Sequence, residues 1–112
     1  MPKKRNLDGV YFRVMRDGHG DAICWTDLMW EERIEFARKN NNHCWLIRMI
    51  KLMNELAWQI EEAYPMIIIP KIILPKETEV SKTWLRNSLI RITADIRLAA
   101  EEYDITVQYD DN

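Results

Sequence analysis

Apolar and polar residues alternate near the start of the chain, which is the pattern of a β-strand. Val10, Phe12 and Val14 point to one side of an extended backbone, and the residues between them point to the other. Residues 17–21 supply Asp and Gly, which tolerate the positive φ of a turn. Residues 22–25 resume β-type side chains, so the pattern predicts an N-terminal β-hairpin.

The next segment changes to helical spacing. Trp30, Ile34 and Ala37 recur at intervals of four and three residues, and Thr26-Asp27 before them suits a helix N-cap. A run of three asparagines then ends the pattern. We therefore expect one short helix after the hairpin.

Two long helices account for most of the remaining chain. The first covers residues 43–64 and is apolar around most of its circumference, so it is either the central helix of the domain or a subunit contact. The second covers about residues 81–103. Its expected buried seam steps by fours and threes through Leu85, Leu89, Ile92, Ile96, Ala99 and Tyr103.

An apolar, proline-bounded stretch separates the long helices. Prolines at positions 65, 70 and 75 exclude a helix and argue against a central strand, which leaves an edge strand or an extended arm. Residues 105–109 alternate again and suit a short closing strand. Together these elements predict a single α+β domain over residues 1–112, with a flexible basic arm at 1–7 and a frayed tail at 110–112.

Composition and charge narrow the function classes. The 112 residues are 47% hydrophobic and 30% charged with a net charge of −2, a balance that provides no strong field toward nucleic acid or a membrane. No segment has eighteen consecutive apolar residues, and nothing resembles a signal peptide. We expect a cytoplasmic protein whose two cysteines are reduced.

Candidate catalytic and metal-binding residues have unsuitable spacing. His19, Cys24, His43 and Cys44 are ligand types, yet they form no CxxC-like or HxxxH-like pair. Neither cysteine lies in an electropositive context that would activate it, and three glycines are too few for a phosphate-binding loop. We therefore predict a non-enzymatic protein with no metal, cofactor or small-molecule substrate.

Protein binding is the function that the sequence favours. The apolar stretch and the first long helix together carry more apolar surface than a domain of this size readily hides, and such a surplus marks an interface. We expect a protein partner or, through symmetric pairing, a homodimer. The predicted partner-binding residues are Trp58, Ile67, Ile68, Ile69, Ile72, Ile73 and Leu74.

Nucleic-acid binding is the alternative. It would use the basic N-terminal segment and the hairpin. On the hairpin, Tyr11 and Phe12 could form a platform on which bases stack, with basic side chains beside it. The candidate residues are Lys3, Lys4, Arg5, Arg13 and Arg16.

A motif string gives the chain a setting. Residues 8–14 read DGVYFRV, and residues 16–18 (RDG), 23–28 (ICWTDL) and 31–33 (EER) follow. The string resembles the opening of short uncharacterised proteins encoded by bacterial prophages and integrative mobile elements, and Trp84-Leu85 and Asp104-Ile105 fit their later part. The resemblance transfers no functional residue; it implies a phage-type accessory protein in a bacterial host cell. In that setting the binding target is expected to be a host defence factor.

Overall fold

A β-hairpin and three helices make up the fold. The computed structural model describes residues 4–40, 42–75 and 80–106. In chain order the elements are β1 (Tyr11–Arg16), β2 (His19–Cys24), the 3-10 turn η1 (Trp25–Asp27), α1 (Trp30–Lys39), α2 (His43–Ala63) and α3 (Lys82–Glu102). The predicted α+β class is confirmed, with both long helices within one residue of their expected bounds. None of these described helices is both long and apolar enough to cross a bilayer.

The hairpin is tighter than predicted. β1 and β2 pair antiparallel from Tyr11 opposite Cys24 to Arg16 opposite His19. Only Asp17 and Gly18 remain in the turn, with φ of 52° and 79°. Positive φ at both central residues defines a type I′ turn, whose twist matches that of the paired strands. Pairing therefore continues through residues that the sequence assigned to a longer turn.

The predicted cap of the short helix is wrong. α1 begins three residues after Asp27, and its N-cap is Met29, whose backbone N–H donates to the Glu32 carboxylate at 2.8 Å. The Asp27 carboxylate instead accepts the backbone N–H groups of Arg5, at 2.9 and 3.0 Å, and Asn6, at 2.9 Å. A carboxylate already occupied by two backbone donors is not available to cap a helix.

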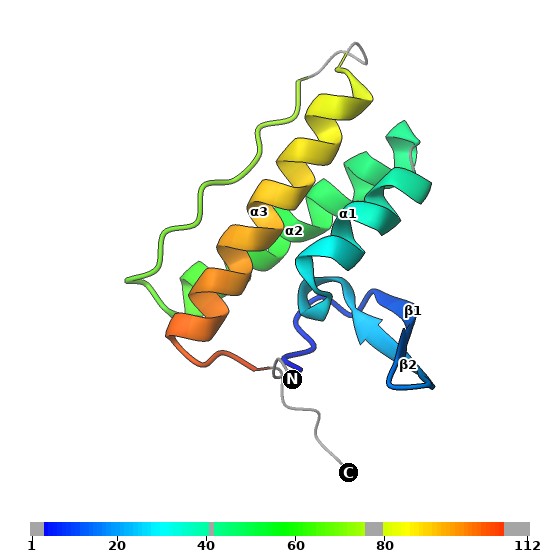
Figure 1. Cartoon of the computed structure of the whole chain (residues 1–112). Coiled ribbons are helices and arrows are strands. Elements are labelled where there is room, and N and C mark those ends of the chain that lie inside the picture. The colour runs from blue at the N-terminus through cyan, green and yellow to red at the C-terminus, as the bar shows by residue number, and fades with distance from the viewer. Residues whose placement is uncertain (1–3, 41, 76–79, 107–112) are drawn as a thin grey trace.

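α2 is the central helix of the domain, so the first of its two sequence interpretations holds. Figure 1 shows α3 lying along α2, with α1 and the hairpin on one side. Leu46, Ile50 and Met53 of α2 are fully buried. The predicted seam of α3 is buried from Leu85 to Ala99, whereas Tyr103 at its end is exposed.

An aromatic cluster joins the hairpin to the helices. The Phe12 ring lies 4.8 Å from Phe36 and 5.6 Å from Trp25 between ring centroids, and Trp25 meets Trp45 edge-on at 5.9 Å. The Trp25 indole N–H donates to the Thr93 hydroxyl of α3 at 2.8 Å, so the buried polar atom is satisfied. Residues of β1, η1, α1, α2 and α3 thus share one core.

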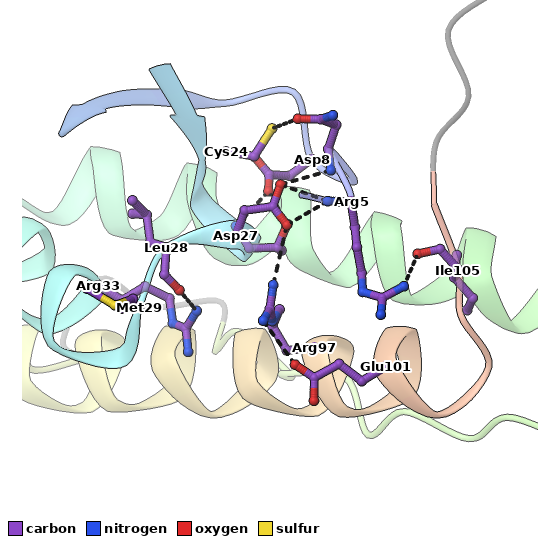
Figure 2. Close-up of polar contacts among 12 residues, drawn as sticks. Arg5, Asp8, Cys24, Asp27, Leu28, Met29, Arg33, Arg97, Glu101 and Ile105 are labelled. Carbon is purple, nitrogen blue, oxygen red and sulfur yellow. Dashed lines mark hydrogen bonds and ion pairs between the residues drawn. The ribbon is translucent and has the colours of Figure 1, made fainter. Parts of the chain in front are cut away.

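The expected flexible N-terminal arm is wrong for residues 5–7. Arg5 and Leu7 are buried, and backbone N–H groups of this segment are bound by Asp27 (Figure 2). The Arg5 guanidinium donates to Asp104 at 3.0 Å and to the Ile105 carbonyl at 3.1 Å, so this segment is bound to the residues that follow α3. Ile105 is buried, and neither Ile105 nor Thr106 is in a strand. Residues 107–109 of the expected closing strand lie outside the described residues, as does the expected frayed tail.

Candidate functional site

The proline-bounded stretch, residues 65–75 and hereafter the arm, is extended and belongs to no sheet among the described residues. It runs along the length of α3, on the side opposite α1 (Figure 1). Its side chains divide between two sides: Ile67 and Ile69 are buried in the core, whereas Ile68 is 85% exposed and Ile73 is 87% exposed. Of the two alternatives that the sequence left open, an edge strand and an extended arm, the structure has the arm.

Polar side chains of α2 fix the arm in place. The Asn54 carboxamide donates to the Ile72 carbonyl at 2.9 Å and accepts from the Ile72 N–H at 2.8 Å. The Glu61 carboxylate accepts the Ile69 N–H at 3.1 Å and forms an ion pair with Lys71. The Lys71 ammonium lies 4.1 Å from the centre of the Trp58 ring. With its inner side held, the arm presents its outer side chains in a defined position.

The predicted partner-binding residues fall into a buried group and an exposed group. Ile67, Ile69 and Ile72 are core residues, so their predicted binding role is corrected. Leu74 is half-buried against the core, and Trp58 is exposed beneath Lys71. The physical reason is that an extended segment turns Ile67 and Ile69 to the same side, and that the hydrogen bonds of Asn54 to Ile72, beyond Pro70, hold Ile72 against α2 as well. Ile68 and Ile73 keep the surface position that was predicted.

The sequence missed the residues that extend this surface onto α3. Leu98 is 64% exposed and lies, with Met66 and Ile68, along a groove of about 380 Å³ between the arm and α3. Tyr64 and Tyr103 meet at one end, with ring centroids 6.3 Å apart. A signal for Leu98 exists, because it stands two positions after the seam residue Ile96 and so faces away from the core. We call Met66, Ile68, Ile73 and Leu98 the outer face.

A second groove lies on the other flank of α3, against α1. It has a volume of about 520 Å³, and both apolar side chains and three arginines line it. It is lined by Trp30, Ile34, Arg38, Arg86, Asn87, Ile90, Arg91, Ala94 and Asp95. Arg91 pairs with Asp95 at 3.0 Å, whereas Arg38 and Arg86 have no carboxylate partner within the described ranges. We call this recess the basic groove.

A polar network links the N-terminal segment, η1 and α3, and its role is structural (Figure 2). Asp27, almost fully buried, accepts from Arg97 at 3.3 Å, and Arg97 also binds Glu101 at 2.9 Å. Asp8 accepts the N–H and hydroxyl of Thr26 at 2.8 and 2.6 Å. These groups satisfy one another, so they leave little capacity for a ligand.

The candidate catalytic and metal-binding residues are not brought together. Cys24 is buried, and burial, followed by the negative charge of Asp8, raises the pKa of its thiol. Cys44 and His19 are exposed, while a ring nitrogen of His43 lies 2.8 Å from the Val80 carbonyl. Over the described ranges, no three His, Cys, Asp or Glu side chains cluster so that they could hold a metal ion.

The residues proposed for nucleic-acid binding differ in their exposure: some are buried or in ion pairs, and others face solvent. Arg5 is buried and committed to Asp104 and Ile105. Arg16 is largely covered by its ion pair with Glu32 at 2.7 Å. Lys4 and Arg13 are exposed, and Lys3 lies outside the described residues. The cations expected to act together therefore do not all reach solvent.

No protein-family model, no curated protein and no solved structure matches this chain. Candidate functional sites are therefore sought on the protein surface, and two surface features are candidates for binding. One is the outer face of the arm and α3, and the other is the basic groove.

Proposed function

We propose that this protein acts without catalysis, by binding another protein through its outer face. The observation that carries the proposal is the arm: α2 holds its inner side with three backbone hydrogen bonds, while Ile68 and Ile73 stay more than four-fifths exposed. Met66 is exposed to the same degree, and Leu98 continues the apolar surface on α3. Met66, Ile68 and Leu98 line one groove, and exposed apolar groups that a fold positions rigidly are typical of interfaces.

The energetics support a partner on this face. Burial of each large aliphatic side chain contributes roughly 1.5–3 kcal/mol. A flexible segment would lose much of that gain when it became ordered on binding, but the clamped, proline-bounded arm has met this cost during folding. The arm is thus a preorganised binding element.

The setting of the proposal comes from the motif string of the hairpin. Its resemblance to short prophage and mobile-element proteins supports an accessory protein that works in the cytoplasm of a bacterial host. We propose a host defence factor as the target that such a protein would inhibit. Self-association through the same face is the form of the proposal that purified protein can test directly.

The test compares outward and control substitutions. Ile68→Asp combined with Ile73→Asp should leave the circular dichroism spectrum and Tm nearly unchanged, because both side chains are already in water. The double variant should lose the self-association that sedimentation detects for the unmodified chain, and should also lose any host protein that the unmodified chain retains. Met15→Asp, at another exposed apolar position on the hairpin, is the matched control and should behave as the unmodified chain does.

Two results would overturn the proposal. In the first, the unmodified chain is monomeric at high micromolar concentration, and the arm variant retains every host protein that the unmodified chain retains. In the second, the protein shifts DNA or RNA with strong salt dependence while the arm variant binds equally well, which would favour the nucleic-acid alternative.

A further inference from the structure

The basic groove combines apolar side chains with arginines that no carboxylate neutralises. It lies between α1 and α3, on the flank of α3 that faces away from the arm (Figure 1). Trp30, at the start of α1, is 50% exposed, and Ile34 and Ala94 are half-buried. Arg38 and Arg86 have no ion-pair partner among the residues that the structure describes. Apolar area and uncompensated positive charge thus meet in one recess.

The apolar and the basic side chains belong to opposite ends of the groove. α1 and α3 run side by side in roughly opposite directions (Figure 1), so the end of α1 lies toward the start of α3. Arg38, in the last turn of α1, therefore shares one end of the groove with Arg86. Trp30 shares the other end with Ala94. Arg86 and Ala94 are eight residues apart, which is about 12 Å along a helix.

We propose that the basic groove binds a helix of a partner protein, with a large apolar side chain of that helix at the Trp30 end and acidic side chains at the Arg38 end. The two ends of the groove correspond to about two helical turns of such a ligand. This site does not depend on the function proposed for the outer face, because it lies on the other flank of α3.

The walls of the groove favour a helix as the ligand. Both walls are α-helices, whose backbone groups bond within the helix, so an extended segment would find no backbone partner there. A helix satisfies its own backbone and offers a row of side chains. Trp30, Ile34 and Arg38 form a row of the same kind on α1, at four-residue spacing. An exposed tryptophan in a recess is a typical anchor of a protein interface.

The charges favour an acidic protein segment over nucleic acid. Arg91, the third arginine of the groove, is already paired with Asp95 at 3.0 Å. Within the described part of the chain, two cations of the groove thus remain unpaired, Arg38 and Arg86, and they lie at one end. One or two carboxylates match them, whereas a phosphate backbone is bound by cations along its path. Asp95 and the exposed Glu31 of α1 would repel phosphates.

Selection from a library of helical peptides tests the proposal. The unmodified chain is the bait, and the library displays random side chains on one face of a stable helix. We expect the enriched helices to carry acidic residues about two turns from a large apolar residue. Their affinity should fall about tenfold or more for Arg38→Glu/Arg86→Glu, because each attraction becomes a repulsion. Lysine in place of the acidic residues should restore binding to that variant, and Trp30→Ala should weaken the original helices.

Matched variants identify the site. Arg13→Glu/Arg48→Glu makes the same change of charge at exposed positions on β1 and α2, and it should bind the enriched helices as the unmodified chain does. Ile68→Asp/Ile73→Asp should also bind them equally, because its substitutions lie on the outer face. Circular dichroism and Tm verify that each variant folds. Should Arg38→Glu/Arg86→Glu unfold, Arg38→Gln/Arg86→Gln removes both charges without repulsion and should weaken binding in the same direction.

The remaining outcomes count against the inference. It is overturned if no helix is enriched, or if the enriched helices bind Arg38→Glu/Arg86→Glu and Trp30→Ala as tightly as the unmodified chain. It is also overturned if an oligonucleotide, and no acidic helix, binds in a way that the charge variant loses. Helices that only Ile68→Asp/Ile73→Asp fails to bind would belong to the outer face, which would support the proposed function and reject this site.

Discussion

The side chain of Asn54 makes the two hydrogen bonds to Ile72 that a neighbouring β-strand would otherwise make. Its Nδ2 donates to the Ile72 carbonyl at 2.9 Å, and its Oδ1 accepts from the Ile72 N–H at 2.8 Å. Ile72 is buried, so both backbone groups need a partner. One helical amide therefore allows an extended segment to lie on a helix instead of in a sheet.

Loss of this amide should release the arm. We expect Asn54→Leu to lower the free energy of unfolding by about 1–3 kcal/mol, because two buried backbone groups lose their partner. Denaturant titration measures the loss, and amide hydrogen exchange should rise at Ile72. Gln59→Leu, at an exposed position on the same helix, is the control and should change little. Equal stability of the Asn54 variant and the control would mean that the arm does not depend on this contact.

The seam of α3 gives a core prediction. Ile92 is fully buried on the core side of α3. Ile92→Ala should therefore lower the free energy of unfolding by about 2–5 kcal/mol. Leu98→Ala, on the opposite side of the helix, should cost far less in a monomeric sample. Thermal unfolding of both variants provides the comparison. A cost below about 1 kcal/mol for Ile92 would place the seam in a loosely packed contact.

Asp27 should be essential to the N-terminal segment. Asp27→Ala leaves the N–H groups of Arg5 and Asn6 and the guanidinium of Arg97 without their acceptor. We expect a loss of about 3–5 kcal/mol, the range for breaking a buried charged network. Urea unfolding at neutral pH measures it, with Asp95→Ala, at a part-exposed position of α3, as the milder control. Similar losses for both variants would contradict the central role of Asp27.

The sequence predicted the helices well because their signals are local. His43–Ala63 and Lys82–Glu102 begin at asparagine and serine side chains that accept backbone N–H groups, and the first ends before a proline. Periodicity likewise located Ile92 in the core. These features depend on neighbours within a few residues, so one sequence is sufficient to find them.

Tertiary contacts decided what the sequence left open or predicted wrongly. Asp27 is a good cap in isolation, but Arg5 and Asn6, more than twenty residues away, occupy it. The arm's apolar run does not reveal which isoleucines turn inward, because that depends on Asn54 and Glu61 of α2. The groove between α1 and α3 could not be predicted from the sequence, because it depends on where α1 lies.

The two thiols should differ sharply in reactivity. Cys24 is buried with a raised pKa, and Cys44 at the start of α2 is exposed. Because the thiolate is the reactive form, a disulfide reagent at neutral pH should titrate about one thiol per folded chain and both in denaturant. Cys44→Ser should abolish the fast reaction. Fast reaction of two thiols in the folded state would contradict the buried position of Cys24.

The buried charge of Arg33 should reduce the stability of the fold. It is buried, its Nη1 donates to the Leu28 carbonyl, and its Nε has no hydrogen-bond partner within the described ranges. Burial, and next the like charge of Arg97, lower the pKa of the guanidinium. Methionine retains the apolar stem and removes the charge, so Arg33→Met should leave the free energy of unfolding unchanged or raise it by up to about 2 kcal/mol.

Two comparisons make the Arg33 measurement decisive. Arg33→Ala removes the stem as well, so it should be less stable than Arg33→Met by the lost packing. Arg38→Met, on the exposed side of α1, should be nearly neutral and reports the effect of a charge change alone. Denaturant unfolding of the three variants ranks them. If Arg33→Met proved as destabilising as Arg33→Ala, the charge itself would be stabilising, and its interaction with the carboxylates of Glu32 and Glu101 would outweigh the cost of burial.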